Sequence, residues 1–221
     1  MNTLRLERWQ KVWLTRMPWA IHSVPGSSMI ELHGVRGFLT PNDLGFLFSL
    51  ASELPAGGTY LEVGSWQGLS GIVVANGLLA NLNLNAQIFC VDTWEGSQEH
   101  QEMSIVREDL LFEVFQKNVI EAQMDCFIKA IRGRSVDVAA SWNGPDLDLI
   151  FIDGDHSAEG CYEDIQAWFP RLAKEGRMLG HDAKPNGSVV AGLERFRAET
   201  GITYQIHKMP QSHYIWELNL N

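Results

Sequence analysis

The stretch LDLIFIDGDH, residues 147–156, decides which class of fold this sequence can adopt. Its first six residues are almost all apolar, as expected for a strand in a sheet that is covered on both faces. The run then ends abruptly in two acids and an imidazole, carried by Asp153, Asp155 and His156. Ligands of open α/β sheets bind at the edge where the strands reach their carboxyl ends. Polar groups at this edge can bind a metal, hold a cationic ligand or move a proton. This stretch alone does not decide among the three roles.

Strand-like and helix-like patterns alternate along most of the chain. Alternation of this kind predicts a parallel sheet with right-handed crossovers. The strands are expected at residues 59–63, 87–91, 126–131, 147–152, 177–180, 202–207 and 213–218. The helices are expected at about residues 4–16, 41–53, 67–82, 104–123, 159–172 and 188–199, with a short helix after Ser135. No helix separates the last two strands, which are expected to form a hairpin.

The predicted fold is α/β: a Rossmann-like doubly wound seven-stranded sheet, mostly parallel with an antiparallel edge strand, and with helices on both faces. We expect a single domain over residues 1–221, with a helical cap region at 1–40 and the core at 41–221. The first helix of the core is well signalled. Thr40 is a suitable N-cap, Pro41 fits the first turn, and the acid Asp43 follows three residues after the cap.

Composition and charge favour a globular protein that binds a small molecule. Of the 221 residues, 45% are hydrophobic and 20% are charged, which is ordinary for such a protein. The net charge is −10 and no block is rich in Lys or Arg, so no nucleic-acid partner is expected. No apolar run approaches the roughly 20 residues of a membrane span, and the first residues lack the apolar core of a signal peptide. We expect a cytoplasmic protein whose three cysteines are free thiols: Cys90, Cys126 and Cys161.

A glycine turn follows the strand at 59–63. Gly64 and Gly68 permit a tight turn between that strand and the next helix. A dinucleotide fingerprint requires small residues throughout, because the backbone must approach a pyrophosphate. Here Trp66 fills the middle of the turn and Glu62 adds a negative charge beside it. This combination suits a cationic ligand such as S-adenosylmethionine, which carries an ammonium, a sulfonium and no phosphate.

The strand at 87–91 is followed by Asp92. An acid at this place can accept hydrogen bonds from both ribose hydroxyls of an adenosyl group. The alternative is an ordinary helix-capping or surface aspartate. The acid and the glycines of the preceding turn favour the ribose role.

These residues together resemble the metal-dependent O-methyltransferases of the catechol and caffeoyl-coenzyme A type, which belong to the class I methyltransferases. The resemblance is closer to a bacterial branch that includes macrolide-sugar O-methyltransferases, and it covers residues 37–182. The family motif after the first strand of the core reads acid, apolar, Gly, small, aromatic, any, Gly, any, Ser. The chain matches this motif at Glu62, Gly64, Ser65, Trp66, Gly68 and Ser70.

The resemblance implies a binding site for S-adenosylmethionine along the sheet edge. It places Glu62 and Ser70 near the methionine end of this cofactor, and Asp92 on the ribose. It places Thr93 and Trp94 near the adenine, together with a turn at 133–136 that contains Arg134 and the expected donor Ser135. Residues 37–40 look like the strip that passes over the cofactor.

The resemblance also implies a divalent metal, with Mg²⁺ or Mn²⁺ expected. Asp153 maps to the first metal ligand, and the adjacent pair His181 and Asp182 maps to the other two. His181 is a departure, because the family usually has an acid there. His156 falls at the position of the catalytic base, which is a histidine in the macrolide-sugar branch. Without a metal, Asp153 could instead bind the cofactor amine, and Asp155 could orient His156 or cap the next helix.

The expected activity is S-adenosylmethionine-dependent methylation of a hydroxyl on a small molecule, such as a sugar or natural product. Two alternatives stay open: an enzyme of the same fold that resembles cephalosporin hydroxylases, or an S-adenosylmethionine-binding protein without catalysis. The segment 93–103 could close over the substrate or be a solvated loop. The aromatic-rich amino end could pack in the core, roof the pocket or form the face of a homo-oligomer, through Trp9, Trp13 and Trp19.

Overall fold

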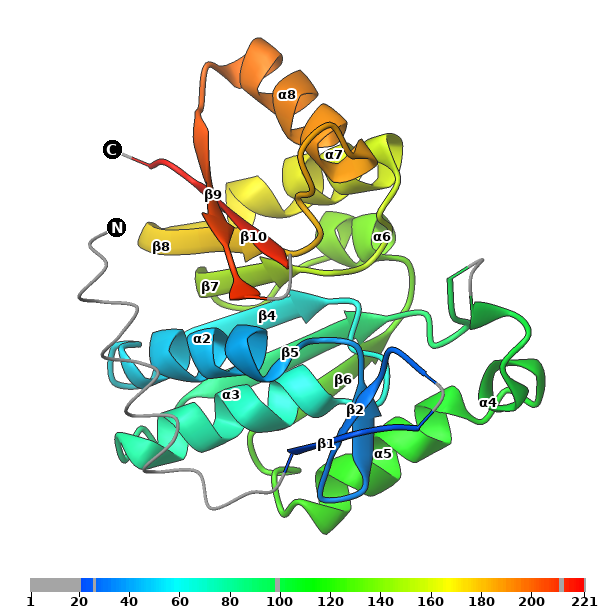
Figure 1. Ribbon diagram of the computed structural model, residues 1–221. Coiled ribbons are helices and arrows are strands. Elements are labelled where there is room, and N and C mark those ends of the chain that lie inside the picture. The colour runs from blue at the N-terminus through cyan, green and yellow to red at the C-terminus, as the bar shows by residue number, and fades with distance from the viewer. Residues whose placement is uncertain (1–20, 26, 98–99, 211–212, 221) are drawn as a thin grey trace.

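The protein is described by a computed structural model that covers residues 21–25, 27–97, 100–210 and 213–220 (Figure 1). The helix expected at 4–16 lies outside these residues. The centre of the structure is a seven-stranded sheet with the order β6-β5-β4-β7-β8-β10-β9. Its strands are β4 (Thr59–Val63), β5 (Gln87–Asp92), β6 (Ile128–Arg132), β7 (Leu147–Ile152), β8 (Leu172–Gly180), β9 (Tyr204–Lys208) and β10 (Tyr214–Leu218).

The pairing of these strands confirms the predicted fold class. The pairs of β4 with β5 and β7, of β5 with β6, and of β7 with β8 are all parallel. The closing hairpin is antiparallel, and β10 lies between β8 and β9. The strand order reverses between β4 and β7, which creates a crevice at the carboxyl ends of these two strands. The two stretches singled out in the sequence, 147–156 and the glycine turn, therefore meet at this point.

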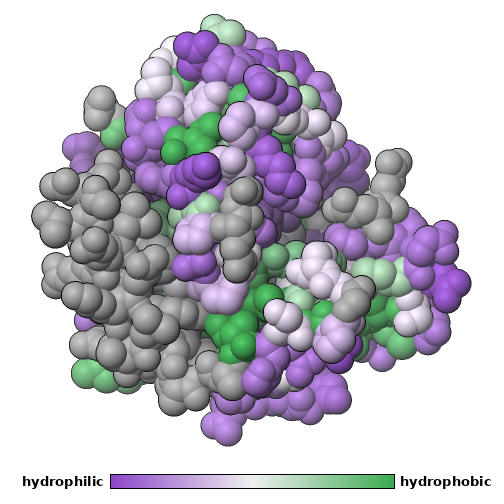
Figure 2. Space-filling model, viewed as in Figure 1, coloured by the Kyte–Doolittle hydropathy of each residue, from purple (hydrophilic) through white to green (hydrophobic). Residues whose placement is uncertain are grey.

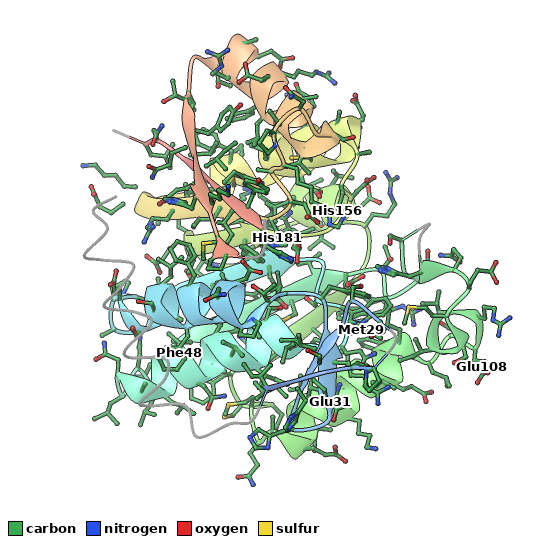
Figure 3. The ribbon with its side chains drawn as sticks, viewed as in Figure 1. Met29, Glu31, Phe48, Glu108, His156 and His181 are labelled. Carbon is green, nitrogen blue, oxygen red and sulfur yellow. The ribbon has the colours of Figure 1, made fainter. Side chains whose placement is uncertain are left out.

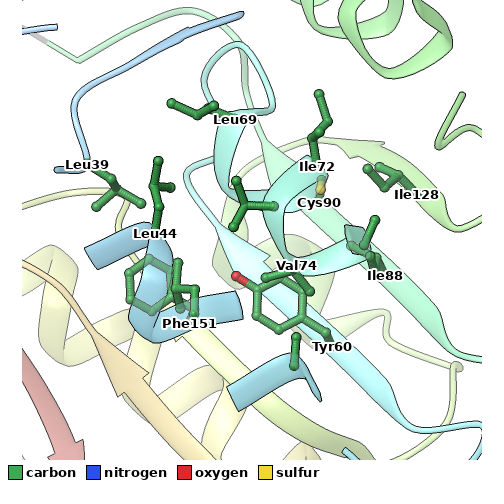
Figure 4. Close-up of a cluster of buried hydrophobic side chains, with 14 of the residues drawn as sticks. Leu39, Leu44, Tyr60, Leu69, Ile72, Val74, Ile88, Cys90, Ile128 and Phe151 are labelled. Carbon is green, nitrogen blue, oxygen red and sulfur yellow. The ribbon is translucent and has the colours of Figure 1, made fainter. Parts of the chain in front are cut away.

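Helices cover both faces of the sheet (Figure 1). One face packs against α2 (Pro41–Ser52), α3 (Leu69–Ala80) and α5 (Leu111–Glu121), and the other packs against α6 (Ser135–Ala140), α7 (Ala158–Trp168) and α8 (Ser188–Thr200). Alternate residues of each strand enter the two cores, because successive side chains of a strand point to opposite faces. In β4, Tyr60 joins the first core and Leu61 the second. Figure 4 shows part of the first core, where Tyr60 and Phe151 meet side chains of α2 and α3.

The described part of the cap region contains strands, while the helix expected at 4–16 lies outside the described residues and stays a prediction. Residues 21–37 form a three-stranded antiparallel sheet of β1 (Ile21–Ser23), β2 (Ile30–Leu32) and β3 (Val35–Gly37). His33 and Gly34 connect β2 to β3, and both have positive φ values, 52° and 84°. Two residues with positive φ are the connection that suits the twist of a tight hairpin.

The single helix expected at 104–123 is also wrong. The chain instead forms α4 (Ser104–Arg107) and α5, with a break between them. Asp109 lies in this break with a φ of 51°, in the left-handed region that a right-handed helix cannot include. Because an aspartate tolerates this conformation, its presence inside an apolar periodic pattern did not reveal the break.

The remaining boundary errors lie around Pro170 and β6. The helix expected at 159–172 ends at Trp168 and passes into a 3-10 turn at Phe169–Arg171, since a proline cannot continue a helix. The strand expected at 177–180 begins earlier, at Leu172, because the sequence Ala-Lys-Glu-Gly at residues 173–176 gave no strand signal. The strand expected at 126–131 begins at Ile128, and Cys126 is exposed whereas Cys90 and Cys161 are buried.

The surface is chemically uneven. Figure 2 shows a largely hydrophilic covering over α7 and α8, and hydrophobic residues gathered over the amino-terminal strands and the α4–α5 segment. No helix among the described residues is long and apolar enough to cross a membrane.

Candidate active site

The site lies at the carboxyl ends of β4 and β7, where two backbone segments are in direct contact. The amide of Asp153 donates to the carbonyl of Val63 at 2.8 Å. A Cβ atom on Gly64, whose φ is 87°, would lie 2.2 Å from the carbonyl oxygen of Asp153. Only glycine therefore fits here, and the reason is contact with the neighbouring strand end. The predicted contact of Gly64 with a cofactor is untested and stays a prediction.

The structure brings together the four residues predicted for metal binding and catalysis. His156 lies between the two acids: its Nε2 is 3.6 Å from Oδ1 of Asp153, and its Nδ1 is 3.5 Å from Oδ2 of Asp182. On the other side of the acids, Nδ1 of His181 is 3.5 Å from the same Asp153 oxygen and 3.6 Å from the same Asp182 oxygen. The labels of His156 and His181 in Figure 3 mark this cluster at the ends of β7 and β8.

The charges of this cluster are strongly coupled. Burial disfavours the charged form of His181, but the charge of Asp153 and the hydrogen bonds to Asp153, Asp182 and Asp43 raise its pKa to about 12. Burial would raise the pKa of Asp182, yet His181, His156 and Lys184 outweigh it and lower that pKa to about 2. In the absence of other ligands, the cluster therefore holds an imidazolium against carboxylates.

Sequence reasoning missed two members of this neighbourhood. Asp43 had been assigned only to the helix cap, and His213 only to the start of a strand. Asp43 is completely buried, and its Oδ2 lies 3.5 Å from Nε2 of His181 and 3.1 Å from Nδ1 of His213. The strand topology could have indicated His213. When two neighbouring strands are antiparallel, the residue before one strand lies at the same sheet edge as the residue after the other. His213 precedes β10 and His181 follows β8.

Asp92 accepts hydrogen bonds from three backbone amides, two of them in the glycine turn and one in the loop after β5. Its Oδ2 accepts hydrogen bonds from the amides of Ser65 and Trp66 at 2.8 and 2.9 Å, and its Oδ1 accepts one from the amide of Trp94 at 2.8 Å. Trp66 has a positive φ of 49°, which the first pair of bonds helps to maintain. Burial raises the pKa of Asp92, although these amide donors act in the opposite direction. Its predicted bond to a ribose stays a prediction.

Two other residues predicted to bind the cofactor, Glu62 and Trp94, form hydrogen bonds within the protein. Glu62 is fully buried, and it accepts hydrogen bonds from the Tyr60 hydroxyl at 3.1 Å and from the Cys90 thiol at 3.2 Å. Burial raises the pKa of Glu62. Trp94 is also fully buried, and its Nε1 donates to the carbonyl of Trp66 at 2.9 Å. Direct contact of Glu62 or Trp94 with a cofactor stays a prediction.

Residues predicted to lie near the adenine also form hydrogen bonds within the protein. Arg134 is the N-cap residue of α6, and Ser135 begins this helix. The hydroxyl oxygen of Ser135 accepts a hydrogen bond from Nε1 of Trp168 at 2.8 Å, which ties α6 to α7. Thr93 caps its own loop by accepting from the amide of Glu95 at 3.2 Å. The roles of these residues toward adenine are untested.

Three aromatic rings join the strip at 37–40 to the glycine turn and to the loop after β5. Phe38 stacks on His100 at a centroid distance of 4.8 Å, and Trp66 lies 5.4 Å from Phe38 and 4.6 Å from His100. The predicted strip therefore does come to the turn. Among the described residues, the buried Nε1 of Trp66 has no hydrogen-bond partner.

Three solved structures with the same arrangement are methyltransferases. The O-methyltransferase NovP superposes with a TM-score of 0.66 at 15% identity, over 82% of this chain and 81% of that chain. TomG from Streptomyces achromogenes, an O-methyltransferase of tomaymycin synthesis solved with S-adenosylmethionine, gives 0.62 at 14% identity, over 83% and 82%. Precorrin-6y C5,15-methyltransferase from Geobacter metallireducens gives 0.60 at 15% identity, over 82% and 89%. At these identities the likeness establishes the fold, which is that of the Rossmann-like methyltransferases.

The family follows from a separate comparison of the sequence. A family model described as a methyltransferase domain matches residues 61–183, which is more than half of the chain. The chain belongs to this family, and the protein is an S-adenosylmethionine-dependent methyltransferase.

Proposed function

We propose that the protein transfers a methyl group from S-adenosylmethionine to a hydroxyl of a small molecule, such as a sugar or natural product, with the help of a divalent metal ion. The observation that carries this proposal is the position of His156 within 3.5–3.6 Å of two carboxylates at the sheet edge. This geometry combines a proton acceptor with oxygen ligands, as methylation of an alcohol requires. O-methyltransferases among the solved structures of this fold support the same reaction.

The glycine turn fits S-adenosylmethionine, which supplies the electrophilic methyl group when bound. Asp92 uses three acceptor positions for backbone amides. We assign a ribose hydroxyl of the cofactor to the same carboxyl group, which stands at the end of β5. The buried indole nitrogen of Trp66, without a partner among the described residues, can donate to a further ligand atom. Glu62 and Asp92 are carboxyl groups at the turn, and a cationic cofactor would favour their ionised forms against the burial that raises the pKa of each.

The strand ends beside the turn fit a divalent ion. Asp153, His181 and Asp182 each offer one ligand atom, and these atoms all lie within 4.8 Å of one another. A bound ion would lower the pKa of the acceptor hydroxyl and orient it. Oxygen ligands suit Mg²⁺, and the imidazole of His181 moves the preference toward Mn²⁺, Fe²⁺ or Co²⁺.

His156 is the group that we assign to proton transfer. A neutral imidazole accepts the hydroxyl proton as the oxygen attacks, and the carboxylates of Asp153 and Asp182 stabilise the imidazolium that forms. The His156 side chain is 40% exposed, so the proton can then leave to solvent. Most of the remaining barrier is met by holding the oxygen, the methyl carbon and the sulfur in line.

A thermal-shift panel tests the cofactor class. S-adenosylmethionine and S-adenosylhomocysteine are expected to raise the melting temperature of the protein, because each stabilises the folded state that binds it. NADH serves as the control ligand for an oxidoreductase such as a hydroxylase-like enzyme. Stabilisation by NADH alone would rule out the proposed function.

A further inference from the structure

The ring of His181 faces potential metal ligands on both of its edges. Its Nδ1 points to the acids Asp153 and Asp182, as described above. Its Nε2 points the other way, to a second group that Asp43 and His213 complete. Nε2 of His181 is 3.2 Å from Nδ1 of His213 and 3.5 Å from Oδ2 of Asp43, and the latter two atoms are 3.1 Å apart. This inner triad consists of two nitrogens and one carboxylate.

The spacing of the inner triad matches a tetrahedral ion. Bonds of about 2.0–2.2 Å from zinc to nitrogen or oxygen place neighbouring ligand atoms about 3.3–3.5 Å apart. The three measured distances, 3.1, 3.2 and 3.5 Å, are close to this value. Mg²⁺ prefers an octahedron of oxygens, so a triad with two imidazoles selects against it. Zn²⁺, Co²⁺ and similar ions accept such a donor set.

The carboxylate of Asp43 supplies independent evidence for a ligand. Asp43 is 0% exposed, and its Oδ2 accepts hydrogen bonds from the amide and the hydroxyl of Thr40 at 2.8 and 2.6 Å. Its Oδ1 is buried and has no hydrogen-bond partner among the residues that the structure describes. A buried carboxylate oxygen without a partner is costly, and a cation that binds both oxygens of Asp43 would remove this cost.

We propose that Asp43, His181 and His213 bind one transition-metal ion of the zinc class, at a site separate from the oxygen-rich one formed by Asp153 and Asp182. The opposite nitrogen of His181 then donates to those two acids, which is the usual arrangement of a metal-bound imidazole. While the inner triad holds its ion, Nδ1 of His181 is therefore not a ligand for an ion at Asp153 and Asp182. The ion joins the start of α2, the end of β8 and the start of β10. It therefore fastens the closing hairpin onto the sheet edge, whether or not the proposed methyl transfer takes place there.

Zinc titration of two variants of the whole chain tests this site. Asp182→Asn removes the outer acid and leaves the inner triad, so we expect it to bind one equivalent of Zn²⁺ in calorimetry. Adding His213→Ala is expected to weaken this binding at least about tenfold, since even the hydrogen-bonding partners of metal ligands contribute 10–100-fold. The same pair titrated with Co²⁺ is expected to differ in the visible absorption that marks tetrahedral cobalt.

His22→Ala in the Asp182→Asn background is the matched control, because His22 is an exposed histidine of β1 and its loss should leave Zn²⁺ binding unchanged. Circular dichroism establishes that each variant is folded. Zinc affinity that survives His213→Ala, or that is already absent from Asp182→Asn, would overturn the proposal. Neither result would decide whether the protein binds S-adenosylmethionine, which the thermal-shift panel tests separately.

Discussion

His181 stands where the resemblance to metal-dependent O-methyltransferases predicts an acid, and its surroundings account for an imidazole there. The ring is buried with carboxylates on both edges, which raise its pKa to about 12 and keep the ring in one orientation. The sequence indicated the partners on one edge, Asp153 and Asp182, because both follow predicted strands. It could not indicate Asp43, which belongs to a helix far away along the chain. Sequence motifs indicate contacts between residues of one element or between residues at the ends of neighbouring strands. The contact between Asp43 and His181 is of neither kind.

Replacing His156 by alanine is expected to lower kcat by about 10²–10⁴-fold, the usual contribution of a general base. The affinity for S-adenosylmethionine should be nearly unchanged, because we assign His156 to proton transfer beside the carboxylates of Asp153 and Asp182. Methyl-transfer kinetics and calorimetry with the cofactor measure the two quantities. If cofactor binding were lost with the activity, His156 would have to be reassigned to the cofactor site.

Replacing Asp164 by asparagine is expected to stabilise the protein at pH 7. Burial raises the pKa of Asp164 from 3.8 to about 6, although a hydrogen bond from Ser135 acts against this shift. A carboxyl with a raised folded-state pKa adds stability at low pH, and this stability is lost as the pH rises toward 6. Since one pKa unit corresponds to about 1.4 kcal/mol, the wild type should lose roughly 2 kcal/mol from this group between pH 4 and pH 7.

Urea denaturation of both proteins at pH 4 and pH 7 measures this effect. The stability of the variant should not fall between pH 4 and pH 7 through this group. At pH 7 the variant should therefore have a larger free energy of unfolding than the wild type. Equal pH dependence in the two proteins would show that Asp164 ionises normally in the folded state.

At the scale of elements, the glycine turn joins β4, β5 and β7. Asp92 at the end of β5 binds the turn through its amides, and Gly64 lets the turn touch the end of β7. Most elements of the seven-stranded core were predictable, because most of its strands are apolar and short and its helices are periodic. The breaks were not, since they depend on single residues such as Asp109 that adopt a left-handed conformation only in their tertiary setting.

Substituting Gly64→Ala is expected to destabilise the protein far more than the matched change Gly57→Ala. Both glycines have positive φ values, 87° and 74°, so both variants carry the left-handed backbone cost of about 1–2 kcal/mol. Only at Gly64 would the new Cβ collide with a backbone carbonyl, whereas Gly57 has nothing within 4 Å. Overpacking of this kind adds about 1–3 kcal/mol or more. Denaturant unfolding of the two variants would contradict this account if their losses of stability were equal.

At the scale of the whole molecule, the candidate functional residues lie at one edge of the sheet. The ends of β4, β5, β7 and β8 and the start of the antiparallel β10 all reach it. The fold class followed from the strand–helix alternation, and the meeting of Asp153, His156 and Asp182 followed from the rule that parallel strands end at a common edge. The amino-terminal sheet of β1 to β3 did not follow, because its three-residue strands are too short to show a period.

The central claim is that this edge methylates an oxygen with the aid of a divalent ion. The most direct measurement is transfer of a labelled methyl group from S-adenosylmethionine to a panel of small diols, with the methylated atom identified by mass spectrometry and NMR. The account predicts methylation of a hydroxyl oxygen, abolished by excess chelator and restored by Mn²⁺ or Mg²⁺. Methylation of carbon or nitrogen, or full activity in excess chelator, would contradict it.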